Sequence, residues 1–200
     1  ACTIGAYTKE EGASACINCG AGRFGERCIE CPIGWSRHER DEKLDGCRQC
    51  DTGKTTNLNG SASCDGCDLG KFGSAPGVCA DCPEGRYQDA KGLLQCKVCP
   101  RNTFYGIKGA TALSQCEACP SDRSTGLTNG STSNASCLCL AGKYYQDDAM
   151  SVACTPCPDG GICPKFGSRT SDMYAQAGFW QPLKDVPEFL RCADAHSNLK

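Results

Sequence analysis

The chain has 200 residues, and its 21 basic and 23 acidic side chains leave a formal net charge of −2 and a sequence pI near 5.7. This balance provides no basic field for a phosphate backbone, so we expect no nucleic acid partner. Leu, Ile, Val and Phe are too few for a large hydrophobic core, whereas 21 cysteines exceed the level that marks a disulfide scaffold. No apolar run reaches the roughly 18 residues of a membrane helix, so we expect no direct membrane insertion in this segment.

The cysteines form an internal repeat. Cys2 is followed by Gly5 and Tyr7, a spacing that recurs in later units, so we interpret it as the second cysteine of a dyad whose first member is absent and expect a longer parent chain. Nine dyads follow, all CxxC except the last but one, which is CxC: Cys16/Cys19, Cys28/Cys31, Cys47/Cys50, Cys64/Cys67, Cys79/Cys82, Cys96/Cys99, Cys116/Cys119, Cys137/Cys139 and Cys154/Cys157. Residues 1–163 are therefore predicted to be a tandem array of about ten units, the first truncated.

Each unit carries a turn residue three positions after its second cysteine. This column reads Gly5, Gly22, Gly34, Gly53, Gly70, Gly85, Asn102, Asp122, Gly142 and Gly160. Gly, Asn and Asp tolerate positive φ best, so the column predicts a fixed turn with left-handed backbone. The polar segments between dyads favour short hairpins or irregular strands, and a helical period is visible only at 171–177. We predict a small disulfide-rich fold: an elongated array of short β-hairpin or irregular units with little regular secondary structure, almost no hydrophobic core, and contacts only between neighbouring units.

Two chemistries are open to the dyads. Cys28, Cys31, Cys47 and Cys50 alone would match a zinc ribbon, but the short spacings, the CxC dyad and three glycosylation sequons favour disulfides in the secretory pathway. Spacing does not fix connectivity. The favoured scheme joins the second cysteine of each dyad to the first of the next: Cys2–Cys16, Cys19–Cys28, Cys31–Cys47, Cys50–Cys64, Cys67–Cys79, Cys82–Cys96, Cys99–Cys116, Cys119–Cys137 and Cys139–Cys154. The alternative joins first to first and second to second.

The repeats resemble a known family. Stretches such as CADCPEGRYQDAKGLLQCKVCP and CLCLAGKYYQDDAMSVACTPCP resemble the ephrin-receptor-like cysteine-rich repeats of large cell-surface and ciliary proteins, and are similar to the loop units of tumour-necrosis-factor receptors. The segment CPDGGIC followed by GFW resembles the end of such arrays in protist and algal surface proteins, including those of flagellar mastigonemes. The resemblance implies an extracellular array and carries over no ligand-binding residue.

Three sequons indicate modification by N-linked glycans at Asn59, Asn129 and Asn134. The alternating charges from Arg37 to Lys43 are interpreted as a solvated loop. Neither His38 nor His196 lies near a nucleophile motif, and no catalytic, phosphate-loop or EF-hand pattern is present, so we expect no enzyme activity, no cofactor and no metal.

The C-terminal segment, residues 164–200, is poor in cysteine and richer in apolar residues. We expect a cap over the last unit or a docking surface, with Phe179, Trp180 and Phe189 as candidate contact residues. Cys163 is expected to bond to Cys157, which leaves Cys192 with a partner outside the chain or in another molecule.

The function predicted from these features is an extracellular, disulfide-stapled and glycosylated spacer rod. It would belong to a cell-surface or filamentous assembly, such as a flagellar appendage, with copies of itself or other extracellular assembly proteins as partners. The alternative is the ligand-binding ectodomain of a cell-surface receptor, which should expose an aromatic or Arg anchor patch.

Overall fold

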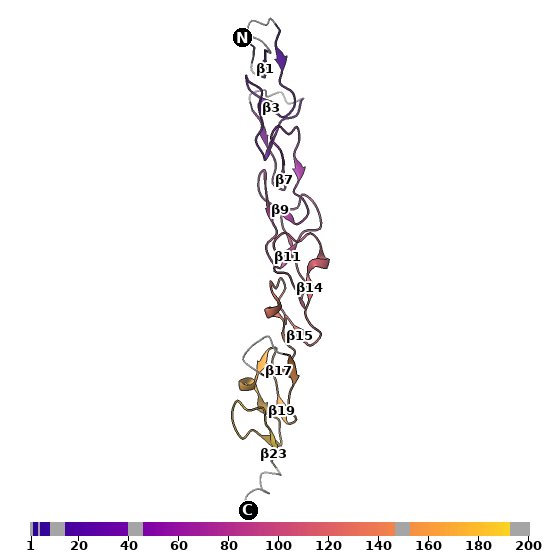
Figure 1. The fold of residues 1–200 in the computed structure, drawn as a ribbon, viewed down its shortest axis with the longest axis vertical. Helices are drawn as coiled ribbons and strands as arrows, with labels where there is room; N and C mark the ends of the chain where they lie inside the picture. Colours follow the sequence, from indigo (N-terminus) through magenta and orange to yellow (C-terminus); the bar gives the residue numbers. More distant parts are fainter. Residues whose placement is uncertain (1, 4, 9–14, 40–45, 147–152, 193–200) are drawn as a thin grey trace, which may run out of the picture. The chain divides into compact units, whose positions relative to one another are not determined.

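The computed structural model describes residues 2–3, 5–8, 15–39, 46–146 and 153–192 (Figure 1). The chain forms two compact units. One comprises Ala1–Lys97 and Lys108–Gln115, and the other comprises Val98–Ile107 and Cys116–Lys200. In both, short hairpins follow one another in chain order.

The first unit is built from antiparallel pairs of mostly two-residue strands. The pairs are β1 (Ala6–Tyr7) with β2 (Ile17–Asn18), β3 (Arg23–Phe24) with β4 (Ile29–Glu30), β5 (Trp35–Ser36) with β6 (Arg48–Gln49), β7 (Lys54–Thr55) with β8 (Asp65–Gly66), and β9 (Lys71–Ala75) with β10 (Val78–Asp81). Strand β11 (Arg86–Tyr87) pairs with β12 (Lys97–Val98), and a 3-10 turn, η1, covers Leu113–Gln115.

The second unit continues the pattern with longer connections. Strand β13 (Thr103–Phe104) pairs with β14 (Glu117–Ala118), β15 (Arg123–Ser124) with β16 (Leu138–Cys139), β19 (Gly161–Ile162) with β21 (Tyr174–Ala175), and β22 (Phe179–Trp180) with β23 (Leu190–Arg191). Strand β17 (Lys143–Tyr145) lies between antiparallel β18 (Cys154–Pro156) and parallel β20 (Ser168–Arg169). The 3-10 turns η2 and η3 cover Asn134–Ser136 and Thr170–Asp172.

A tight turn starts each hairpin, as the glycine column predicts. The N–H of Trp35 donates to the carbonyl of Pro32 at 3.0 Å, and Gly34 between them has φ 81°. Positive φ at the third position of a hydrogen-bonded turn is the type II geometry that selects glycine. Asn102 adopts it as well, with φ 64°.

Asp122 departs from the column, because its φ is not positive. The prediction of left-handed backbone is wrong at this position. Its carbonyl accepts the N–H of Leu140 at 3.1 Å, whereas in the preceding hairpin Asn102 accepts from the second cysteine of the dyad, Cys119. The CxC spacing thus shifts the hairpin closure by one residue.

Ten disulfides close the hairpins with the same pairing as the favoured scheme, from Cys2–Cys16 to Cys139–Cys154, together with Cys157–Cys163. By the loop-closure model, a loop of about 15 residues contributes roughly 3 kcal/mol. Most of the buried apolar side chains are cysteines, and those of Cys31, Cys67, Cys82 and Cys99 are fully inaccessible. The predicted fold class, an array of small disulfide-rich hairpin units, is confirmed. Among the described residues there is no α-helix; η3 and β21 lie at 171–177, where the sequence shows a helical period.

Hairpins contact more than their immediate neighbours along the chain, contrary to the expectation from the sequence. A Cβ on Gly34 would lie 2.8 Å from the carbonyl oxygen of Gly77, and one on Gly53 would lie 2.7 Å from that of Gly92. Each of these contacts skips one intervening hairpin. The turn glycines are therefore required by close backbone approach as well as by φ.

The hairpin pattern continues past residue 163 to Cys192. The N–H of Cys192 donates to the carbonyl of Gly178 at 2.9 Å. Second cysteines make the same bond with the turn glycine of the hairpin that they end, as Cys31 does with Gly22. In this register Met173 and Phe189 stand where first cysteines would be. Both are buried, in a cluster with Tyr144 and Cys163 that is extended by Cys157, Ala175 and Phe179. An apolar cluster therefore replaces disulfides where the cysteines are missing.

Candidate functional site

The feature that recurs through the chain is a set of hydrogen bonds between successive hairpins. The turn residue of one hairpin donates its N–H to the residue three positions after the turn of the next. Thr56 and Thr125 accept with their hydroxyl oxygens, from Gly34 at 2.8 Å and from Asn102 at 2.9 Å. In other hairpins the acceptor is a backbone carbonyl: Gly22 to Arg37 at 2.7 Å, Gly70 to Gln88 at 2.8 Å, and Gly142 to Cys163 at 3.1 Å.

These acceptor residues make up much of the buried polar interior. Arg37, Thr56, Gln88 and Thr125 are 1%, 2%, 0% and 6% exposed. Buried polar groups are tolerated where they are hydrogen-bonded, and here the partners belong largely to the adjacent hairpin. The interior thus joins hairpins through polar contacts as well as through sulfur. This column was not predicted from the sequence, although polar residues three places after several turns, as at Arg37, Thr56, Gln88 and Thr125, were its visible signal.

Arg37 makes the most extensive of these contacts. Its Nη1 donates to the carbonyl oxygens of Arg23 at 2.7 Å, Gly20 at 3.2 Å and Cys19 at 3.5 Å, all in the preceding hairpin. The solvated-loop interpretation is therefore wrong for Arg37, because its guanidinium is buried where it donates to three backbone carbonyls. His38 and Glu39 are exposed, and Arg40 to Lys43 lie outside the described residues.

A second set of contacts docks each long loop on the preceding hairpin. The N–H of a loop glycine with positive φ donates to a carbonyl of the preceding hairpin. The acceptor is the second cysteine of the dyad at which that hairpin begins. The pairs are Gly60 with Cys31, Gly92 with Cys67, Gly109 with Cys82, Gly130 with Cys99 and Gly167 with Cys139, each at 2.8 or 2.9 Å. The loop closed by Cys99–Cys116 makes both kinds of contact, through its turn residue Asn102 and its docking glycine Gly109.

The three sequon asparagines, Asn59, Asn129 and Asn134, are all exposed. Asn59 and Asn129 immediately precede docking glycines, whereas Asn134 begins η2 and its carbonyl accepts the N–H of Cys137 at 2.9 Å. Their modification by glycans stays a prediction.

The predicted contact residues of the C-terminal segment separate in the structure. Trp180 is 40% exposed, whereas Phe189 is 9% exposed and belongs to the apolar cluster. Phe179 packs partly against that cluster, with the guanidinium of Arg191 5.7 Å from its ring centroid. Phe189 is therefore a buried packing residue, because it fills a position that cysteine holds elsewhere, and a contact role for the segment stays a prediction. Cys192 is exposed and unbonded within the described residues.

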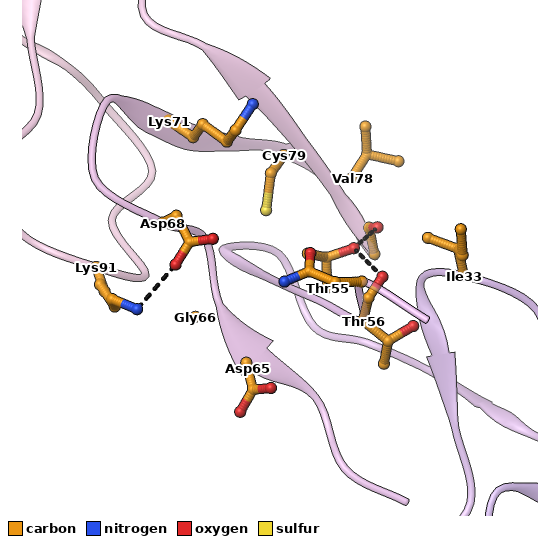
Figure 2. A pocket seen from close by; sticks show the side chains of 12 residues that line it. Ile33, Thr55, Thr56, Asp65, Gly66, Asp68, Lys71, Val78, Cys79 and Lys91 are labelled. Atoms are coloured by element: carbon orange, nitrogen blue, oxygen red, sulfur yellow. Dashed lines mark hydrogen bonds and ion pairs between the residues drawn. The ribbon is translucent and has the colours of Figure 1, made fainter. Parts of the chain in front are cut away.

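A pocket of about 690 Å³ lies among hairpins of the first unit. Figure 2 shows Asp68 facing Lys91 at one side, and Thr55, Ile33 and Val78 at the other. Asp68 and Lys91 form an ion pair at 2.8 Å, whose hydrogen bond and charge lower the pKa of the Asp68 carboxyl and raise that of the Lys91 ammonium. The Thr55 hydroxyl donates to the carbonyl of Gly77 at 2.7 Å. The lining mixes paired charges with exposed aliphatic side chains and concentrates no charge of one sign.

Within the described part of the chain, no group of three or more His, Cys, Asp or Glu side chains is arranged to hold a metal ion. Nor does that part contain a helix of the length and apolarity needed to cross a membrane.

Comparison with known proteins places this geometry among extracellular repeats. Residues 70–116 match the family model described as tyrosine-protein kinase ephrin type A/B receptor-like. The chain is 26% identical over 172 residues to mouse (Mus musculus) signal peptide, CUB and EGF-like domain-containing protein 2, covering 84% of this chain and 16% of that protein. It is 25% identical over 158 residues to the Homo sapiens protein of the same name, covering 77% of this chain and 14% of that protein. The chain thus spans about one sixth or less of the length of these relatives.

Proposed function

We propose that this extracellular cysteine-rich repeat domain, whose residues 70–116 are ephrin-receptor-like, is a structural spacer within a larger extracellular assembly. The observation that carries the proposal is the double linkage of successive hairpins. From Cys2 to Cys154 a disulfide closes each loop, and hydrogen bonds from turn residues and docking glycines join hairpins to their neighbours. A spacer needs this property, because a load applied along the chain passes from one covalently closed loop to the next.

Force spectroscopy on the intact chain tests the spacer role. In the oxidised protein the disulfides keep residues inside closed loops from extending, so pulling should release only the connections between loops. After reduction, a loop such as Cys119–Cys137, with a sequence separation of 18, should add roughly 55 Å, since an extended residue spans about 3.5 Å. Long extensions at low force from the oxidised chain would contradict a load-bearing spacer.

We also propose that Cys192 forms a disulfide with a cysteine of a following hairpin or of another molecule. It lies in the register of second cysteines, and the nine disulfides from Cys2–Cys16 to Cys139–Cys154 each join such a cysteine to the first of the next dyad. Mass spectrometry of native material after blocking free thiols tests this directly. A blocked Cys192 in the native protein would contradict it, and a larger species on a non-reducing gel would identify the intermolecular form.

The finer form of the spacer proposal is a filament built from copies of the chain or from other assembly proteins. Its support is the repetitive, self-similar architecture, and a place in a cilium or flagellar appendage rests on the sequence resemblance alone. Electron microscopy of native material tests it: regular fibres are expected, and isolated molecules would contradict the filament.

The pocket beside Asp68 and Lys91 favours a second candidate function, a ligand-binding ectodomain. Its aliphatic and charged lining could accept a segment of a protein ligand. Val78 is 51% exposed and lines the pocket, so Val78→Arg should abolish binding of such a ligand and leave the force response unchanged. A ligand that binds the variant and the parent equally would contradict this site.

A further inference from the structure

Two of the three sequons occupy the same structural position in different hairpins. In Asn59-Gly60-Ser61 and Asn129-Gly130-Ser131, the middle residue is a docking glycine, with φ 72° and 69°. Gly60 donates to the carbonyl of Cys31 and Gly130 to that of Cys99, both at 2.8 Å. The serine carbonyl then accepts an N–H from the same preceding hairpin: Arg37 donates to Ser61 at 3.3 Å, and Tyr105 to Ser131 at 3.0 Å.

A sequon needs both its asparagine amide and its serine hydroxyl to be accessible, and this docked geometry leaves only the asparagine exposed. The Asn59 and Asn129 side chains remain exposed. Ser131, however, is only 5% exposed, and its hydroxyl finds no hydrogen-bond partner among the described residues. The Ser61 hydroxyl donates to the carbonyl of Leu58 at 2.8 Å. An enzyme that reads the serine hydroxyl together with the asparagine amide therefore cannot engage Ser131 once its loop has docked.

Exposed leucines lie beside both asparagines. Leu58 directly precedes Asn59 and is 73% exposed, and Leu127 lies two residues before Asn129 and is 80% exposed. These are the most exposed large apolar side chains of the described residues. A bulky, solubilising glycan on the adjacent asparagine would cover such a side chain.

We propose that Asn59 and Asn129 carry N-linked glycans, attached before their loops dock on the preceding hairpins, and that these glycans cover Leu58 and Leu127. The donor is an oligosaccharide linked to a lipid diphosphate. The asparagine side-chain nitrogen forms a bond to the sugar C1, the bond from C1 to the diphosphate oxygen breaks, and the amide proton passes to a base. The inference requires passage through the secretory pathway, and it does not depend on the spacer role.

Asn134 provides an internal comparison. Its sequon, Asn134-Ala135-Ser136, lies at η2 and contains no docking glycine, and Ser136 is partly exposed. Docking of the loop glycine therefore does not govern modification of Asn134 in the way it governs Asn129.

The experiment has an occupancy arm and a timing arm. The chain is secreted from animal cells, and glycosidase release in heavy-oxygen water marks each formerly occupied asparagine for mass spectrometry. Unglycosylated chain with its ten disulfides formed is then compared with the same chain reduced and alkylated, both as acceptors for microsomal oligosaccharyltransferase with lipid-linked oligosaccharide. Ser131→Ala and Ser61→Ala variants, which keep the asparagines, define the background.

We expect occupancy at Asn59 and Asn129 in secreted protein. We also expect at least tenfold faster transfer to Asn129 in the reduced chain than in the oxidised chain. Equal rates in the two forms would overturn the timing, and secreted protein without sugar at both asparagines would overturn the sites. For the covering role, glycosidase-treated protein should bind a hydrophobic dye more strongly, and Leu58→Ser with Leu127→Ser should remove the increase; an increase that persists in this variant would overturn it.

Discussion

The hydroxyl oxygen of Thr56 accepts the backbone N–H of Gly34 at 2.8 Å and so joins two consecutive hairpins. Thr125 and Asn102 make the equivalent bond at 2.9 Å in the other unit. A tight turn leaves the backbone N–H of its turn residue without a partner in its own hairpin, and an acceptor of the next hairpin bonds to it. Consecutive hairpins are therefore joined by hydrogen bonds, although from Cys2 to Cys154 each loop is closed by its own disulfide.

Replacing Thr56 with Val tests this bond at nearly constant side-chain volume. Thr56 is 2% exposed, so the variant leaves the Gly34 N–H buried without its acceptor, which costs about 1–3 kcal/mol. Hydrogen exchange at the Gly34 amide should accelerate by roughly tenfold or more. The control is Thr52→Val at an exposed position, which should leave that rate unchanged. An unaltered Gly34 rate in Thr56→Val would contradict the coupling.

The turn glycines provide a second test, because Gly22 and Gly25 share the same backbone region. Their φ values are 75° and 74°, so alanine strains each by about 1–2 kcal/mol. A Cβ on Gly22 would also collide with the carbonyl of Gly60, whereas one on Gly25 would meet nothing within 4 Å. Gly22→Ala should therefore destabilise the protein more.

The readout is hydrogen exchange at the Gly60 amide, which bonds to Cys31 across the same contact. Gly22→Ala should speed it and Gly25→Ala should not. Equal effects of the two variants would show that φ alone selects glycine here and that the contact between alternate hairpins is unimportant.

The sequence predicted those features of the fold that depend on the spacing of residues close together in the chain. The dyads and the glycine column predict the hairpin array, because a closed loop and a positive-φ turn are local properties. The contacts between Gly34 and Gly77 were not predictable in this way, since nothing in the spacing of one unit shows which backbone will approach it. Arg37 was misinterpreted for a similar reason: it begins a charge-rich run, and the acceptors that bury it lie in the preceding hairpin.

Removal of the Arg37 side chain should be strongly destabilising. Arg37→Ala removes the guanidinium, itself 1% exposed, that donates to three carbonyls of the preceding hairpin, at an expected cost of about 2–4 kcal/mol in the free energy of unfolding. Arg27→Ala removes the same charge at an exposed position and should change stability by less than about 0.5 kcal/mol. Denaturant unfolding of oxidised protein measures both, and similar midpoints for the two variants would refute a stabilising role for the Arg37 hydrogen bonds.

At the C-terminal end, Met173 and Phe189 show how the array continues without cysteine. Each stands in the register of a first cysteine, and each is buried in the cluster that also holds Cys163. Burial of such side chains contributes about 1.5–3 kcal/mol each, comparable to the roughly 3 kcal/mol of one disulfide. Packing can therefore hold a hairpin that has lost its bridge, with no change in the strand register.

Phe189→Ala tests this replacement against Trp180→Ala in the same hairpin. Phe189 is 9% exposed and Trp180 is 40% exposed, although β22 and β23 pair directly. Loss of the buried ring should cost about 3–5 kcal/mol of local stability and speed exchange of the Cys192 amide, which bonds to Gly178. Loss of the more exposed Trp180 ring should leave exchange of the Cys192 amide nearly unchanged and cost less than half as much local stability. If both variants exchange the Cys192 amide at the same rate, the cluster does not hold the last hairpin, and the apolar residues have not taken over the role of the missing sulfur.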